Sequence, residues 1–223
     1  MRLALFASGG GSNVGAILDA IDAGRLDADP VVLVSDRPDA GALARAEDRG
    51  IPTAVAEPAA TEAAFAEVLL DGLARYEVDA VALAGYLRKI PDPVVWAYRG
   101  KILNVHPSLL PAFGGAGMYG RHVHRAVIER GCRVSGATVH LVDSEFDTGP
   151  IVLQEAVPVE PDDTPESLAA RVLAVEHRIY PQALALLAKG RLRVDGRRVE
   201  ILTPTRPDPS IPSDGSHQRP PFP

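Results

Sequence analysis

Two polar side chains lie two residues apart in an apolar segment near the middle of this 223-residue chain. The segment Lys101–Pro111 reads KILNVHPSLLP and predicts a buried strand that ends before Pro107. Side chains alternate across a strand, so we expect Asn104 and His106 on one face at its carboxyl end, where open α/β sheets bind ligands. An amide that stabilises an oxyanion, beside an imidazole that carries a proton, indicates chemistry at a polarised carbonyl. In isolation, the same pair could equally cap a loop and bond the backbone.

A third candidate is Asp147, which lies in the segment Asp143–Gly149 (DSEFDTG), a predicted turn between two strands. A carboxylate there could hold His106 in its cationic form or position a water, although Asp also serves turns by bonding its own backbone. The chain has no nucleophile elbow and no Ser–His–Asp order, which favours direct transfer between two bound reactants over a covalent mechanism. The other central histidines do not match the spacing of a metal motif, so no metal site is expected (His122, His124 and His140).

A glycine-rich turn near the N-terminus predicts an anion site. Ser8–Ser12 (SGGGS) follows the predicted strand Arg2–Ala7, and an apolar-periodic helix begins at Asn13. Glycine lets the backbone approach a ligand, and the amides and dipole of a helix N-terminus favour negative charge. The turn lacks the Lys of a Walker A loop, and no GxGxxG fingerprint fits it. A phosphate monoester therefore fits better than a nucleoside triphosphate or NAD; a turn without a ligand is the alternative.

The elements that must position these residues alternate between strand and helix, which predicts an α/β fold: a doubly wound, mostly parallel sheet with helices on both faces. A small hairpin is expected after the last helix. We expect one domain over residues 1–202 and a disordered, proline-rich tail over 203–223. The predicted strands are Arg2–Ala7, Val31–Ser35, Thr53–Ala56, Val78–Ala84, Ile102–His106, Val134–Leu141 and Ile151–Val157. The main predicted helices after the first are Ala40–Arg49, Glu62–Tyr76, His122–Arg130 and Pro165–Lys189.

Composition narrows the class of protein. The formal net charge is −6 and no basic block occurs, which argues against a nucleic-acid partner. One cysteine, Cys132, cannot form an internal disulfide. No apolar run is long enough to cross a bilayer and no signal-peptide core opens the chain, so we expect a cytoplasmic protein without a membrane partner. The glycine-rich stretch Gly114–Gly120 suggests a mobile loop over a cleft, and a slack connection between two elements is the alternative.

Several motifs, taken in order, carry a family resemblance from the N-terminus to about residue 202. The chain resembles the folate-dependent glycinamide ribonucleotide formyltransferases, whose Rossmann-like formyltransferase fold agrees with the expected sheet. The matching motifs are Ser8–Asn13, Ala84–Arg88, Asn104–Pro111, Asp143–Gly149 and Glu176-His177.

The resemblance implies a site for two small molecules, glycinamide ribonucleotide and the co-substrate 10-formyltetrahydrofolate, without a metal. It implies that Asn104 and protonated His106 stabilise the oxyanion formed when the amine attacks the formyl carbon, supported by Asp147. The enzyme is expected to be a monomer or homodimer. By the same resemblance, the phosphate is held by Gly11, Ser12 and Asn13, the ribose by Glu176, and the folate by Leu87, Arg88, Lys89, Ile90, Asn104, Asp143 and Asp147.

Two departures from the family pattern stand out. Glu62 lies where the family has a basic residue for the folate tail, and the loop over residues 113–120 is longer and richer in glycine. Related readings are a methionyl-tRNA formyltransferase, which shares the Asn-x-His-Pro strand, and a formyltetrahydrofolate hydrolase. A non-catalytic nucleotide-binding module is a third, from another class, which retention of all three polar residues argues against.

Overall fold

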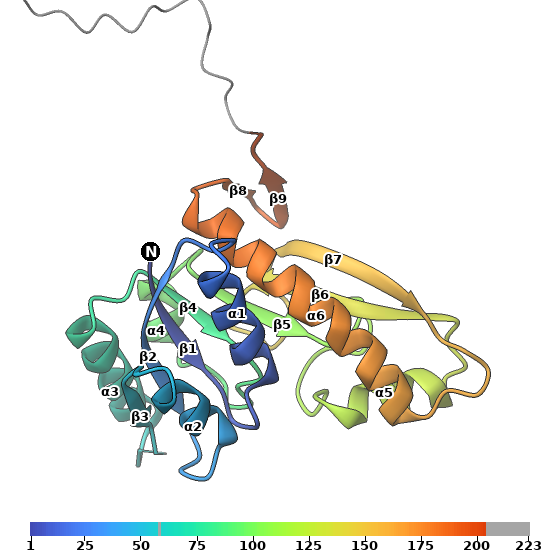
Figure 1. Ribbon diagram of the computed structural model, residues 1–223, viewed down its shortest axis with the longest axis horizontal. Helices are drawn as coiled ribbons and strands as arrows, with labels where there is room; N and C mark the ends of the chain where they lie inside the picture. The colour runs from blue at the N-terminus through green and yellow to red at the C-terminus, as the bar shows by residue number, and fades with distance from the viewer. Residues whose placement is uncertain (58, 204–223) are drawn as a thin grey trace, which may run out of the picture.

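The computed structural model describes residues 1–57 and 59–203, so all but the first residue of the predicted tail lies outside the described part. A seven-stranded sheet is flanked by helices and followed by a two-stranded hairpin (Figure 1). The strands are β1 (Arg2–Phe6), β2 (Asp29–Ser35), β3 (Thr53–Val55), β4 (Ala80–Leu83), β5 (Ile102–His106), β6 (Val134–Leu141), β7 (Ile151–Pro158), β8 (Leu192–Asp195) and β9 (Arg198–Ile201). The helices are α1 (Ser12–Asp22), α2 (Gly41–Glu47), α3 (Glu62–Arg75), α4 (Asp92–Ala97), α5 (Arg121–Glu129) and α6 (Pro165–Ala188).

The strand order is β3-β2-β1-β4-β5-β6-β7. Strands β1 to β5 pair in parallel, whereas β6 runs antiparallel to β5 and β7 antiparallel to β6. The predicted doubly wound, mostly parallel sheet and the C-terminal hairpin are therefore confirmed. The order reverses between β1 and β4, and the crevice outside the carboxyl ends of strands at such a point is the usual ligand site of an open α/β sheet.

Each face of the sheet has its own apolar core, because alternate residues of a strand point to opposite faces. In β1, Leu3 and Leu5 belong to the core under α1, α2, α5 and α6, while Ala4 and Phe6 belong to the core under α3 and α4. All four side chains are buried. Figure 1 shows α1 and α6 lying across the same face of the sheet. None of the helices in the described residues is long and apolar enough to cross a membrane.

Helix ends differ slightly from the sequence-based expectations. α1 begins one residue earlier, at Ser12, because Gly11 takes a left-handed conformation (φ 71°) and serves as its N-cap. α2 covers Gly41–Glu47 rather than Ala40–Arg49, because Gly50 (φ 68°) reverses the chain after its last turn. Terminal turns of this kind depend on local hydrogen bonds rather than on apolar periodicity.

The long helix α6 is tied to the central strand that carries Asn104 and His106. It begins at a capping box formed by Thr164 and Ser167. Further along, Tyr180 is completely buried, and its hydroxyl donates a hydrogen bond to the Leu103 carbonyl of β5 at 2.9 Å. α6 therefore holds β5 by a polar contact as well as by apolar packing.

We predict that Tyr180→Phe lowers the free energy of unfolding by about 1–2 kcal/mol, because the Leu103 carbonyl loses a buried donor while the ring remains packed. Urea unfolding at neutral pH measures this change. Tyr119→Phe is the matched control, since Tyr119 is 46% exposed, and it should change the stability by less than about 0.5 kcal/mol. An equal effect of both substitutions would contradict the assigned role of Tyr180.

Candidate active site

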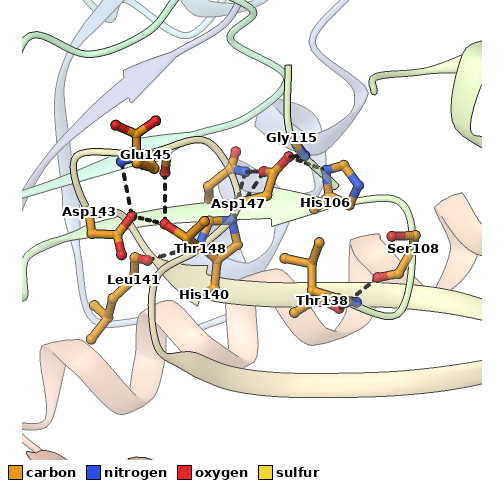
Figure 2. Close-up of polar contacts among 12 residues, drawn as sticks. His106, Ser108, Gly115, Thr138, His140, Leu141, Asp143, Glu145, Asp147 and Thr148 are labelled. Atoms are coloured by element: carbon orange, nitrogen blue, oxygen red, sulfur yellow. Dashed lines mark hydrogen bonds and ion pairs between the residues drawn. The ribbon is translucent and has the colours of Figure 1, made fainter. Parts of the chain in front are cut away.

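Three predicted residues, Asn104, His106 and Asp147, meet at the carboxyl end of β5. His106 Nδ1 lies 3.3 Å from Asp147 Oδ2, and Asn104 Nδ2 lies 3.5 Å from Asp147 Oδ1. Figure 2 shows Asp147 reaching from the β6–β7 turn toward His106. Asn104 and His106 face the same way because one residue separates them in the strand. The structure thus brings together the three residues that the sequence placed on two separate segments.

Asp147 is a buried carboxylate whose charge is compensated on several sides. Burial raises its pKa, but hydrogen bonds with the His106 and His140 imidazoles, the charge of His106 and the Gly115 N–H outweigh burial and hold the pKa well below its usual range. The Gly115 N–H donates to Asp147 Oδ2 at 2.8 Å. Asp147 itself has a left-handed backbone conformation (φ 58°), which Asp tolerates better than most residues.

Sequence reasoning missed the part that His140 takes in this cluster. Its Nδ1 donates to the Leu141 carbonyl at 2.9 Å, while its Nε2 lies 3.1 Å from Asn104 Nδ2 and 3.6 Å from Asp147 Oδ1. The pairing of β5 with β6 places His140 directly opposite Asn104. The available signal was the alternation of the 134–141 strand, but the register that brings His140 to Asn104 is a tertiary property.

The glycine-rich loop over residues 113–120 closes onto the same cluster. His106 Nε2 lies 2.8 Å from the Phe113 carbonyl, which can only accept, so this nitrogen donates. A Cβ at Gly114 would lie 2.6 Å from Leu110 Cδ2 and 3.1 Å from Asp147 Cβ, so a side chain there would have to displace its neighbours. The loop lies over a cleft, as one of the two interpretations of the sequence predicts, because Gly115, Gly117 and Gly120 line the cavity described below; its mobility stays a prediction.

The predicted anion loop has the form of an amide cradle. In the described residues, the backbone N–H groups of Gly9 to Asn13 donate no hydrogen bond to the protein. Several successive free amides at a helix N-terminus, one of them from a left-handed glycine, are a common binding arrangement for phosphate. Ser8 anchors the start of this loop, because its Oγ accepts a hydrogen bond from the Leu87 N–H at 2.9 Å.

Asn13 and Glu176 form a buried polar pair beside this cradle. Asn13 Nδ2 donates to Glu176 Oε2 at 2.7 Å, and both residues are buried. Burial raises the pKa of Glu176, and the Asn13 hydrogen bond and the charge of His106 offset only part of that effect. The Oδ1 atom of Asn13 is buried and has no hydrogen-bond partner in the described residues. The pair therefore retains unused hydrogen-bonding capacity at the cavity wall.

One cavity of about 570 Å³ collects the predicted site residues. Glu62, the first residue of α3, does not line the cavity. Phe65 of the same helix packs under the guanidinium of Arg88, whose Cζ lies 3.7 Å from the centre of the Phe65 ring. A residue that the sequence did not indicate is His124, buried on α5, whose pKa is lowered by burial and by the charge of His106. Of the predicted set, Gly11 alone lies outside the lining; the others that line the cavity are Ser12, Asn13, Leu87, Arg88, Lys89, Ile90, Asn104, His106, Asp143, Asp147 and Glu176.

Comparison with known proteins gives a consistent result. The formyl transferase family profile matches residues 1–184. The chain is 46% identical over 195 residues to phosphoribosylglycinamide formyltransferase, chloroplastic, of Arabidopsis thaliana, covering 86% of this chain and 67% of that protein. It is 42% identical over 188 residues to phosphoribosylglycinamide formyltransferase of Bacillus subtilis, covering 83% of this chain and 94% of that protein. The crystal structure of glycinamide ribonucleotide transformylase 1 from Symbiobacterium toebii superposes with a TM-score of 0.86 at 45% identity, covering 91% of this chain and 94% of that one.

A doubly wound sheet with an Asn–His–Asp cluster beside an amide cradle defines a group-transfer enzyme, and the chain belongs to the formyl transferase family. Within that family, its high identity over most of the Bacillus subtilis protein and of the Symbiobacterium toebii structure places it among the phosphoribosylglycinamide formyltransferases. The resemblance stated from the motifs is therefore confirmed.

We predict that Asp147→Asn lowers the free energy of unfolding at pH 7 by about 3 kcal/mol, because it leaves His106 without its charge partner. Because the folded-state pKa of Asp147 is depressed, the carboxylate contributes stability above its unfolded pKa of about 4. That contribution is lost as the pH falls through the lower folded-state pKa. Urea unfolding between pH 7 and pH 3 should therefore show the difference between wild type and variant shrinking below about pH 4.

The control for Asp147→Asn is Glu145→Gln, in the same turn, whose side chain makes no ion pair or hydrogen bond in the described residues. This variant should unfold like the wild type at every pH. A constant difference between Asp147→Asn and wild type down to pH 3 would contradict the depressed pKa of Asp147.

Glu176→Gln should change stability in the opposite direction. The variant removes a buried charge, and the Gln side chain can still accept the Asn13 hydrogen bond. The pKa of Glu176 is raised, so the wild type is penalised as the pH rises through that value, and the variant is not. We expect Glu176→Gln to be more stable than wild type at pH 8 and equal to it near pH 4 in urea unfolding. The exposed Glu67→Gln should match wild type at both pH values, and lower stability of Glu176→Gln at pH 8 would refute the argument.

Proposed function

We propose that the chain transfers the formyl group of 10-formyltetrahydrofolate to the amine of glycinamide ribonucleotide, a step of purine nucleotide synthesis. The products are the N-formyl ribonucleotide and tetrahydrofolate. The observation that carries the proposal is a single cavity with a carbonyl-activating cluster, Asn104, His106 and Asp147, beside an amide cradle for a phosphate. The Asn13–Glu176 pair lines the same cavity.

The acceptor subsite is assigned to the cradle end of the cavity. The free amides of Gly11, Ser12 and Asn13 suit the three oxygens of a phosphate monoester and the positive end of α1. Glu176, which already accepts from Asn13, offers its second carboxylate oxygen to a ribose hydroxyl. The buried and unpartnered Asn13 Oδ1 supports a polar ligand at this wall.

The donor subsite is assigned to the segments that follow β4 and β6. Residues 87–90 and 143–147 form two irregular walls of the cavity, where backbone N–H and C=O groups can pair with a pterin ring. Apolar side chains in the first wall, Leu87 and Ile90, provide a surface for the flat ring. Arg88 and Lys89 add positive charge beside a substrate that carries carboxylates. The Lys89 ammonium also pairs with Asp92, since its Nζ lies 3.9 Å from Asp92 Oδ1.

In the proposed reaction, the amine of the acceptor attacks the formyl carbon, and negative charge develops on the formyl oxygen. The Asn104 amide and the protonated His106 imidazole donate hydrogen bonds to this oxyanion, and His106 Nε2 exchanges the Phe113 carbonyl for the formyl oxygen to do so. Asp147 balances the imidazolium charge and supports a water-mediated proton transfer. In this transfer the proton lost by the amine passes through a water to N10 of the folate as the carbon–nitrogen bond breaks. The two bound reactants require orientation and electrostatics, and no step in this scheme uses a metal.

The acceptor site favours the ribonucleotide transferase over the two alternative activities, formyltetrahydrofolate hydrolysis and methionyl-tRNA formylation. A hydrolase acting on the same folate needs only water and has no use for a phosphate cradle beside a ribose-binding carboxylate. A tRNA formyltransferase needs a basic surface, whereas the net charge of this chain is −6. We infer a cytoplasmic enzyme of two small molecules, working as a monomer or homodimer.

The experiment that tests the function is the absorbance change on release of tetrahydrofolate from 10-formyltetrahydrofolate, with and without glycinamide ribonucleotide. Turnover that depends on the ribonucleotide supports the proposal. Equal turnover without it would identify a hydrolase. Absence of turnover, together with formylation of methionyl-tRNA, would identify the tRNA enzyme.

We predict that His106→Ala lowers kcat by about 10²–10³-fold, because a buried oxyanion donor is lost. Affinity for the ribonucleotide should stay within about twofold, since the cradle is untouched. Single-turnover kinetics and isothermal calorimetry measure the two quantities. The exposed His122→Ala on α5 is the control and should keep wild-type kcat, and a His106→Ala enzyme with near-normal kcat would contradict the mechanism.

A further inference from the structure

The short helix α2 packs against the anion loop, and two residues of α2 donate hydrogen bonds to backbone carbonyls of the loop. The Gly9 carbonyl accepts a hydrogen bond from the Ala42 N–H at 3.0 Å. The next carbonyl, that of Gly10, accepts one from Arg45 Nε at 2.7 Å. Neither Ala42 nor Arg45 lines the cavity, so both approach the loop from its outer side.

The anion loop and α2 lie so close together that no side chain fits between their backbones at Gly11. A Cβ at Gly11 would lie 2.8 Å from Ala42 Cβ and 2.9 Å from its Cα, and Gly11 has φ 71°. A Cβ at Gly41 would lie 3.4 Å from Gly10 Cα. Glycine on both sides of the contact therefore allows α2 to support the loop at short range.

The planarity of the peptide group links these carbonyls to the amides of the cradle. In a trans peptide the C=O of one residue and the N–H of the next point in opposite directions. Fixing the Gly10 carbonyl toward Arg45 therefore turns the Gly11 N–H away from α2. Fixing the Gly9 carbonyl toward Ala42 does the same for the Gly10 N–H. Orientation of the cradle thus depends on what holds its carbonyls.

Arg45 differs from Ala42 because its donor is charged and belongs to a side chain. A hydrogen bond from a guanidinium is stronger than one between neutral groups, and it polarises the peptide so that the N–H at its other end becomes a better donor. In the described residues, Gly10 is the only hydrogen-bond partner of the Arg45 side chain, and no carboxylate neutralises it. Its positive charge is therefore available to the anion loop.

We propose that Arg45 is a positioning residue for the substrate phosphate: from the outer side of the loop, it aims and polarises the Gly11 N–H through the Gly10 carbonyl. The proposal rests on the function proposed above, in which this loop holds the phosphate of the ribonucleotide. Arg45 touches no reacting atom, so its contribution is expected in binding of the phosphorylated acceptor and not in the chemical step.

The test compares Arg45→Gln with Arg45→Lys and a control, Arg49→Gln. Arg49 follows the same helix, but pairs with Asp19 and Asp22 and makes no contact with the loop. We expect Arg45→Gln to raise KM for glycinamide ribonucleotide about tenfold, with kcat and KM for the folate unchanged. Arg45→Lys should recover part of the loss, since its ammonium can still donate to the Gly10 carbonyl, and Arg49→Gln should behave as wild type.

A phosphate-free acceptor, glycinamide riboside, separates positioning from general support of the fold. Its KM should be the same in wild type and Arg45→Gln, because only the phosphate uses the Gly11 N–H. Equal losses for both acceptors, or loss of kcat and folate affinity together with a lower Tm, would overturn the proposal in favour of a structural role.

A binding measurement keeps the inference distinct from the proposed activity. The Kd of ribose 5-phosphate, measured by calorimetry, should rise about tenfold in Arg45→Gln and remain unchanged in Arg49→Gln. Unchanged affinity in Arg45→Gln, or no binding to the wild type, would overturn the role of Arg45 whatever the outcome of the turnover assay. Conversely, an enzyme that binds ribose 5-phosphate through Arg45 but transfers no formyl group would disprove the proposed function alone.

Discussion

The buried carboxylate of Asp147 is the interaction on which the rest of the site depends. A carboxylate without partners at this depth would protonate, and it stays ionised because His106, His140 and the Gly115 N–H surround it. Each partner comes from a different element: β5, β6 and the glycine-rich loop. The Asp147 carboxylate therefore holds three segments in place relative to one another. Movement of any of them would leave the buried charge without one of its partners.

The sheet and its helices could be predicted from the sequence because the burial that stabilises them also sets the spacing of apolar residues along the chain. Strand–helix alternation and apolar runs gave the doubly wound sheet, and the period of two placed Asn104 and His106 on one face. The Asp143–Gly149 turn was recognised as polar, and the family motifs connected Asp147 to the histidine. These features are local, so they can be read from short stretches of sequence.

What the sequence could not provide were contacts set by register and by loop path. His140 meets Asn104 because β5 and β6 pair antiparallel with these residues opposite each other, and no local pattern specifies that pairing. The Phe113 carbonyl reaches His106 through an irregular glycine-rich loop, where torsion angles rather than side-chain periodicity set the path. The Arg45 contact with Gly10 joins residues 35 positions apart and likewise has no sequence signature.

Helix α6 makes two polar contacts one helical turn apart, and they lead to different parts of the site. Glu176 binds Asn13 at the start of α1, and Tyr180 binds the Leu103 carbonyl of β5. The helix thus connects the segment assigned to the ribonucleotide with the strand that carries Asn104 and His106. A shift of α6 along its axis would carry both segments together, so the two contacts couple the position of the acceptor segment to that of the catalytic strand.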